Sequence, residues 1–210
     1  MVLVQSIDVS AIDTGPQGLT TDGKYLWFCG SQNSQVYKID KFGNLILNFA
    51  VDKPQGITTD GKYLWVMIFS SEPAIALINQ YDKFGNLIQS IDVSAIDANP
   101  TGITFDGKNL WFCGVENQSI YQIDTFGNLI TTLAVGGIAT GLQGITTDKK
   151  YLWWDDFNGP NMHQIDKFGN LIQNTAIVPP LTNPWGMTFD GKYLWIVDKT
   201  AATINQWSRF

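Results

Sequence analysis

A group of acidic residues and the single histidine could support acid–base or metal chemistry in this sequence. Asp155 and Asp156 are adjacent, and His163 follows them. Asp198 occupies the place of Asp156 in the next copy of an internal repeat. Carboxylates beside an imidazole can bind a divalent cation or transfer protons. These residues define one functional alternative, a metal-assisted lyase or hydrolase.

Asp155 also breaks the pattern of that repeat. Its counterparts in the other copies are apolar: Cys29, Met67, Cys113 and Val197. A carboxylate in an apolar slot must find a partner or shift its pKa. We therefore count Asp155, with Asp156 and Asp198 along the same rim, among the ligand-binding candidates. The alternative is an acidic rim satisfied by water, with His163 as a structural, hydrogen-bonded histidine.

A second set of side chains could bind a ligand without reacting with it. The residue before a recurring glycine differs in type among the five copies: Gln17, Gln55, Thr101, Gln143 and Trp185. An indole can stack on a sugar or aromatic ring, while amides supply directional hydrogen bonds. The alternative is that Trp185 lies flat on the neighbouring unit as a packing residue.

Both sets are positioned by five copies of one repeating unit. Five copies follow the pattern G-[IL]-T-x-D-G-K-x-L-W, with Lys149 for the second glycine in the fourth and Met187 for Ile or Leu in the fifth. The first four continue through I-D-x-F-G-N-L-I with small variations. The units cover residues 16–53, 54–99, 100–141, 142–183 and 184–210 plus 1–15. The fifth copy stops at Phe210, and its missing part is "LVQSIDVSAID" at residues 3–13, which nearly repeats "LIQSIDVSAID" at residues 87–97. We predict one closed ring, a single domain over residues 1–210.

Each unit has the local signals of four short strands. Its β-branched and aromatic runs are separated by Asp-Gly and Phe-Gly-Asn turns, which favour hairpins. The sequence therefore predicts an all-β fold, a five-bladed β-propeller of four-stranded antiparallel blades. Residues 2–9 should close the ring by completing the C-terminal blade, with the two termini within about 10 Å. The repeated tryptophans should pack between blades, and both cysteines should be free.

The repeat resembles the blades of NHL-repeat, gluconolactonase-like and streptogramin-lyase-like propellers of bacteria over the whole chain. Those families mostly have six or seven blades. For a streptogramin lyase the resemblance implies metal-assisted histidine chemistry, but no second histidine or catalytic glutamate matches beside His163. A gluconolactonase-like site implies Glu and Asn ligands around the channel, where this sequence has threonines: Thr20, Thr58, Thr104, Thr146 and Thr188. The resemblance implies a fold and no activity.

Sequence variation is concentrated on one side of the predicted disc. In a four-stranded meander, the Asp-Gly and Phe-Gly-Asn turns lie on one face, and they hardly change from copy to copy. The loops between the second and third strands, and the connectors between units, lie on the other face and differ in sequence and length. We expect the variable face to carry the function. The alternative is that surface loops simply drift.

The net charge and composition limit the classes of binding partner that we expect. The chain has 13 basic and 19 acidic residues, a net charge of -6, and no basic stripe. We expect neither nucleic acid nor an anionic membrane as a partner. No secretion signal or membrane-spanning segment is visible, and we assign no compartment. We expect a monomer.

These observations favour a non-catalytic ligand-binding propeller that recognises carbohydrate or another small polar ligand on the variable face. We assign no catalytic residue, no metal ligand and no cofactor. A divalent cation belongs to the lyase or hydrolase alternative. A structural module of a larger assembly is the second alternative.

Overall fold

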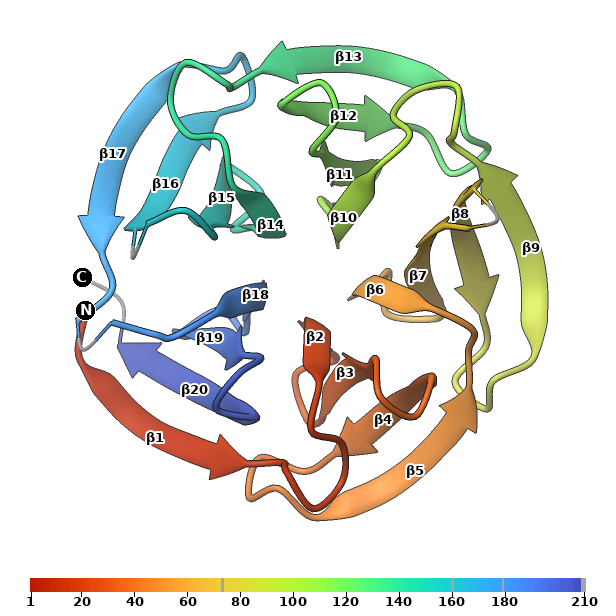
Figure 1. The fold of residues 1–210 in the computed structure, drawn as a ribbon, viewed down its shortest axis with the longest axis vertical. Coiled ribbons are helices and arrows are strands. Elements are labelled where there is room, and N and C mark those ends of the chain that lie inside the picture. The colour runs from red at the N-terminus through yellow and green to blue at the C-terminus, as the bar shows by residue number, and fades with distance from the viewer. Residues whose placement is uncertain (73, 160, 179, 209–210) are drawn as a thin grey trace.

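The structure is a computed structural model that describes residues 1–72, 74–159, 161–178 and 180–208. In these residues, twenty strands form five four-stranded antiparallel sheets. The sheets stand radially around a central axis (Figure 1). The prediction of a five-bladed β-propeller is confirmed.

The first four blades are meanders whose strands follow the chain from the axis outward. Blade 1 contains β2 (Pro16–Thr21), β3 (Leu26–Gly30), β4 (Gln35–Ile39) and β5 (Leu45–Ala50). Blade 2 contains β6 (Pro54–Thr59), β7 (Leu64–Ser71), β8 (Ala74–Tyr81) and β9 (Leu87–Asp92). Blade 3 contains β10 (Pro100–Phe105), β11 (Leu110–Gly114), β12 (Ser119–Ile123) and β13 (Leu129–Ala134). Blade 4 contains β14 (Leu142–Thr147), β15 (Tyr151–Asp156), β16 (Asn161–Asp166) and β17 (Leu171–Ala176).

Blade 5 combines the two ends of the chain. Its inner strands are β18 (Pro184–Phe189), β19 (Tyr193–Asp198) and β20 (Thr203–Ser208), and its outer strand is β1 (Leu3–Asp8). The register runs antiparallel from Leu3 opposite Trp207 to Asp8 opposite Thr203. The predicted closure by the N-terminal strand is confirmed. The expected position of Phe210 beside Met1 lies outside the described residues.

Local hydrogen bonds explain why the Asp-Gly turns repeat so faithfully. Asp22 accepts bonds from the Lys24 and Tyr25 backbone N–H groups and, at Oδ2, from the Trp27 indole at 3.1 Å. Gly23 has a φ of +89°, which few other residues adopt without strain. Asp40 similarly organises the Phe-Gly-Asn turn, accepting from the Phe42 and Asn44 backbones. We call the side of the disc that holds these two kinds of turn the turn face.

The recurring glycine of each inner strand is required by crowding at the axis. A Cβ added to Gly56 would lie 2.6 Å from the Thr101 carbonyl oxygen of the next blade. The corresponding glycines of the other blades meet a neighbouring backbone in the same way. Five inner strands can therefore converge only where this position lacks a side chain.

The core lies between the blades rather than within a single layer. Five clusters of buried apolar side chains each join adjacent blades. The repeated tryptophans belong to these clusters, and Trp153, the most exposed of them, is only 6% exposed. Cys29 and Cys113 are buried, free and in different clusters. Packing tryptophans and unpaired cysteines were both predicted.

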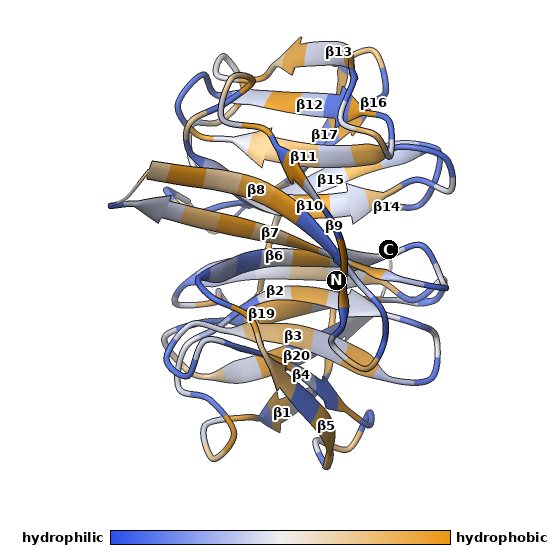
Figure 2. Ribbon diagram, turned by 90° about the vertical axis from the view of Figure 1, so that its right-hand side faces the viewer, coloured by the Kyte–Doolittle hydropathy of each residue, from blue (hydrophilic) through white to orange (hydrophobic). Residues whose placement is uncertain are grey.

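The loops between second and third strands and the connectors between blades form the opposite side, which we call the mouth face. The β7–β8 hairpin extends beyond the rest of the disc (Figure 2). Pro73 lies outside the described residues. No helix that is long and apolar enough to cross a membrane occurs in the described ranges.

Candidate functional site

A pocket of about 320 Å³ lies at the mouth of the central channel. Its lining includes all five members of the predicted ring: Gln17, Gln55, Thr101, Gln143 and Trp185. Each comes from the start of an inner strand, so the five-fold repeat carries them to one place. Four further residues complete the lining: Phe69, Asn99, Val115 and Lys199. The repeat register therefore predicted where these side chains gather.

Two ring members are already engaged by the protein. With its amide oriented to suit its neighbours, Gln17 donates from Nε2 to the Pro54 carbonyl at 2.7 Å and accepts at Oε1 from Lys199 Nζ at 2.8 Å. Thr101 Oγ1 lies 3.2 Å from the carbonyl oxygens of Leu142 and Gln143 and donates to them. These bonds tie adjacent blades together at the axis and shape the floor of the pocket.

The other two polar ring members have capacity left for a ligand. Oε1 of Gln143 is buried and has no hydrogen-bond partner in the part of the chain described. Gln55 is partly exposed and lines the same pocket, with its side-chain amide 3.2 Å from Gln17 Oε1. An unsatisfied buried amide oxygen is costly unless something donates to it. Gln143 is thus the member of the ring that gains most from a bound hydrogen-bond donor.

One face of the Trp185 indole is covered by a lysine. Lys199 Nζ lies 3.8 Å from the centre of the Trp185 rings, in cation–π geometry. Phe157 meets the indole edge-on, with ring centres 6.3 Å apart. A sugar ring could stack on the lysine-covered face only if the ammonium moved away. A ligand role for Trp185 remains a prediction.

Lys199 is the functional candidate that the sequence interpretation missed. It follows β19, where the other blades have Ser31, Phe69, Val115 and Phe157. Burial lowers its pKa from the usual lysine value. No carboxylate of the described residues lies within 4 Å of its Nζ, so its charge is balanced only by the indole and the Gln17 amide. The sequence did contain a signal for Lys199, because it is charged and its four counterparts are not.

Asp155 lies inside the protein and not in the mouth pocket. Its side chain is fully buried, and Oδ1 accepts a bond from the Gly144 N–H at 2.6 Å. Its Oδ2 has no hydrogen-bond partner within the described ranges. Burial raises the pKa of Asp155 to about 7. Contact with a ligand would require the inner strands of blades 4 and 5 to separate.

Asp156 and Asp198 organise loops. Asp156 accepts from the Asn158 N–H at 2.9 Å, and Asp198 accepts from Thr182 N–H at 2.6 Å and Ala201 N–H at 3.1 Å. Both occupy the place where blades 1 and 3 have a glycine, Gly30 or Gly114. In those blades the carboxylate comes instead from the preceding connector.

Asp13 and Asp97 supply that connector carboxylate. A Cβ added to Gly30 would collide with the carboxylate of Asp13, and one added to Gly114 with that of Asp97. Asp13 accepts from Gly15 and Asn33 backbone N–H groups, as Asp97 accepts from its own loop. The same place in four blades therefore holds a carboxylate, delivered from two sequence positions. A loop-capping role accounts for the contacts of Asp156 and Asp198; their ligand-binding role stays a prediction.

His163 takes the structural place of a tyrosine. Its ring stacks on Trp154 with centres 5.0 Å apart, as Tyr37 stacks on Phe28 at 5.0 Å. Its Nδ1 lies 2.7 Å from Asn174 Oδ1, and its Nε2 lies 3.6 Å from Asp156 Oδ2. Tyr37 likewise donates its hydroxyl to the loop carboxylate of Asp13, in the connector before blade 1. The architecture therefore accounts for the contacts of the histidine.

The acidic residues and the histidine do not form a cation site together. Asp155 is sealed between blades, whereas Asp156 and His163 face one another in a loop contact. No group of three or more His, Cys, Asp or Glu side chains suitable for a metal occurs among the described residues. The lyase or hydrolase alternative gains no support from this arrangement.

No family model and no curated protein matches the chain. Among solved structures, it is similar to glutaminyl cyclase of Myxococcus xanthus, with 10% identity, a TM-score of 0.79, and coverage of 98% of this chain and 94% of that one. A streptogramin B lyase is 17% identical, with a TM-score of 0.60 and 96% of each chain covered. A nidogen–laminin complex is 17% identical, with a TM-score of 0.63 and coverage of 87% and 72%. These likenesses confirm the streptogramin-lyase-like and NHL-like resemblance at the level of fold alone.

Proposed function

We propose that the protein is a non-catalytic binding propeller that holds a small polar ligand, carbohydrate first among the candidates, in the mouth pocket. The observation that carries this proposal is the convergence of the five ring residues with Lys199 in one cavity of about 320 Å³. That volume is at the lower end of the range for small-molecule sites. It suits one sugar unit or a ligand of similar size.

The charge of the pocket favours a ligand with an acidic group. Lys199 Nζ is partly buried, and within the described ranges no carboxylate lies within 4 Å of it. A ligand carboxylate could pair with this ammonium, while its hydroxyls donate to Gln143 Oε1. An acidic sugar such as a uronic acid combines both features.

The composition of the lining favours binding over catalysis. Glutaminyl cyclase and streptogramin B lyase share the fold, but activity is a property of the site. The residues named in the lining include no Asp, Glu or His, and Lys199 is the one ionisable side chain among them. A paired acid and base, which cyclisation or elimination requires, has no counterpart in that set.

Titration with D-glucuronate and D-glucose, followed by tryptophan fluorescence and calorimetry, tests the proposal. We expect glucuronate to bind with a Kd near millimolar and glucose at least several-fold more weakly, since the contacts are few. Lys199→Met should remove the preference for glucuronate while keeping the alkyl contact with Trp185. Lys192→Met is the matched control, because Lys192 lies over Tyr193 on the turn face.

Absence of binding by both sugars and by a glycan array would contradict the carbohydrate class. Preference for glucuronate that survives Lys199→Met would contradict the assigned pocket. A fall in melting temperature on chelation, lost in Asp155→Asn, would instead support the lyase or hydrolase alternative.

A further inference from the structure

On the turn face, the Asp-Gly turn of one blade meets the Phe-Gly-Asn turn of the next. In three junctions the next blade places a lysine against the turn aspartate. The Nζ–Oδ2 distances are 3.9 Å for Lys83 and Asp22, 2.7 Å for Lys167 and Asp106, and 3.3 Å for Lys41 and Asp190. At the junction of blades 2 and 3, Thr125 stands where the others have lysine. In the remaining copy the corresponding sequence position is Arg209, which lies outside the described residues.

Two of these junctions form a matched pair. The blade 5–blade 1 junction contains Asp190, Tyr193, Trp195, Gln206, Gln5, Lys41 and Phe42. The blade 2–blade 3 junction contains Asp60, Tyr63, Trp65, Gln80, Gln89, Thr125 and Phe126. Both junctions also keep the hydrogen bond between blades. Gln5 Nε2 donates to the Lys41 carbonyl at 3.1 Å, and Gln89 Nε2 donates to the Thr125 carbonyl at 3.0 Å. Lysine or threonine is thus the one difference of residue type.

The filled junctions show what occupies this position. Lys41 Nζ lies 3.3 Å from Asp190 Oδ2 and 5.9 Å from the centre of the Trp195 rings. In blade 1, Lys38 Nζ lies 4.1 Å from the centre of the Tyr25 ring. The turn carboxylate and the aromatic faces therefore attract an ammonium from more than one direction.

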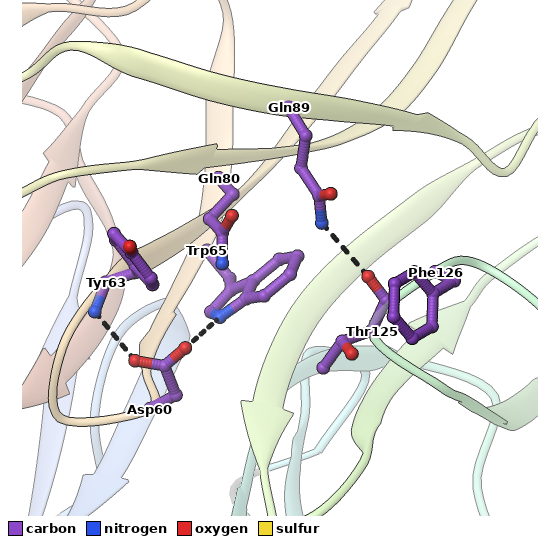
Figure 3. A pocket seen from close by; sticks show the side chains of 7 residues that line it. All are labelled: Asp60, Tyr63, Trp65, Gln80, Gln89, Thr125 and Phe126. Atoms are coloured by element: carbon purple, nitrogen blue, oxygen red, sulfur yellow. Dashed lines mark hydrogen bonds between the residues drawn. The ribbon is translucent and has the colours of Figure 1, made fainter.

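Without the lysine, the junction of blades 2 and 3 is a pocket of about 260 Å³ (Figure 3). Asp60 keeps the bonds of its counterparts, accepting from the Tyr63 N–H at 2.7 Å and from the Trp65 indole at 3.0 Å. Among the described residues, no lysine, arginine or histidine nitrogen lies within 4 Å of its carboxylate. Phe126, which is 82% exposed, forms an apolar rim.

We propose that this pocket binds a primary alkylammonium group, which takes the place of the missing lysine. The carboxylate of Asp60 and the face of Trp65 receive the charge, and Phe126 contacts the alkyl chain. Lys62 Nζ already lies 4.6 Å from the centre of the Tyr63 ring, so Tyr63 lines the pocket without adding a second free face. The pocket excludes anions because the carboxylate faces it. This site lies on the turn face and is independent of the proposed function at the mouth.

The test is a titration with n-butylammonium chloride, with n-butanol as the neutral analogue, followed through the indole N–H signals by NMR. We expect the Trp65 signal to shift saturably with the amine, with a Kd near millimolar. Butanol should bind at least tenfold more weakly. Lysine with both ends capped tests whether the ammonium group belongs to a protein partner. An affinity equal to that of n-butylammonium indicates that the ammonium group suffices, and a higher affinity indicates a lysine side chain of a partner.

Two reciprocal variants make the test sharp. Thr125→Lys should abolish the response at Trp65, whereas Thr125→Ser should retain it. Lys41→Thr should create a second amine site, seen as a new saturable shift of the Trp195 signal. Equal shifts with amine and butanol would overturn the proposal, as would an unchanged response in Thr125→Lys. A folded Lys41→Thr variant whose Trp195 signal ignores the amine would also overturn it.

Discussion

On the turn face, the same aspartate in the same register fixes each Asp-Gly hairpin, whereas on the mouth face the loop carboxylate reaches its place by two routes. Asp22 and its counterparts Asp60, Asp106 and Asp190 each accept an indole bond from their own blade. Asp13 comes from a connector, but Asp156 comes from the end of a strand. The Asp-Gly turns repeat because each of these aspartates bonds to its own hairpin.

In four blades the sequence of the mouth face can vary while the loop carboxylate keeps its position. Where the second strand ends in glycine, there is room for an aspartate from the connector. Where the strand ends in aspartate, that residue supplies the carboxylate and the connector needs none. Variation in loop sequence is therefore compatible with a constant loop architecture. Variable loop sequences alone are therefore weak evidence for function. The meeting of Gln143 Oε1 and Lys199 Nζ in the mouth pocket is stronger evidence.

The largest effect should come from removing the strand that supports both faces of blade 5. Deleting residues 1–9 leaves the edge of β20 unpaired and exposes the apolar side of the blade. We expect a fall in melting temperature of tens of degrees or loss of cooperative unfolding, measured by circular dichroism. A deletion that left the melting temperature unchanged would contradict ring closure.

The second largest effect is the dependence of stability on pH that we expect from the buried carboxyl of Asp155. Its folded pKa is raised to about 7 from 3.8, because burial disfavours the charge. The free energy of unfolding is therefore highest, as far as Asp155 is concerned, below about pH 4, where the carboxyl is neutral in both states. It falls as the pH rises toward 7, because the unfolded chain ionises Asp155 more readily than the folded protein does. The loss should total about 4 kcal/mol, since each pKa unit is worth about 1.4 kcal/mol.

Urea unfolding at pH 5 and pH 8 measures the part of this loss that falls between pH 5 and 7, about 3 kcal/mol. Asp155→Val should flatten the dependence on pH and equal or exceed the wild type in stability at pH 8, because an apolar slot is refilled. Asp52→Asn, at an exposed connector position, is the control. An Asp155→Val protein that keeps the wild-type slope would assign the pH dependence to another group.

The third prediction tests the two routes to the loop carboxylate. Asp13→Ala should destabilise the protein by about 2–3 kcal/mol, because the N–H groups of Gly15 and Asn33 lose a buried acceptor. Adding Gly30→Asp should restore at least half of this loss, whereas Gly30→Asp alone should destabilise by overlap with Asp13. Additive losses in the double variant, measured by urea unfolding, would show that the routes are not equivalent.

The smallest effect on stability is expected at the mouth itself. Trp185→Ala should weaken ligand binding about tenfold, while the free energy of unfolding changes by less than about 1 kcal/mol. Calorimetric titration and urea unfolding measure the two quantities. A large loss of stability with affinity intact would identify Trp185 as a packing residue.

The repeat register made the ring, its closure and the polar circle at the mouth predictable from sequence. Equivalent residues of a symmetric ring must meet around one axis, so Gln17 and Trp185 could be placed without coordinates. The cover of Lys199 over Trp185 could not be predicted, because the direction of a long loop side chain is not set by the register. The loop role of Asp156 was also hidden, because its structural equivalent Asp13 occupies a different position in the repeat.

Closure of the ring also has a consequence for the time at which the protein can finish folding. Val2 and Ser208, which are hydrogen-bonded at the closing pair of strands, are 206 positions apart. At about 5–20 residues per second, β1 leaves the ribosome roughly 10–40 s before its partner β20 exists. Blades 1–4 can form as local meanders during that interval. Pairing of β1 with β20 therefore cannot begin until β20 has been synthesised, so the ring cannot close during most of synthesis.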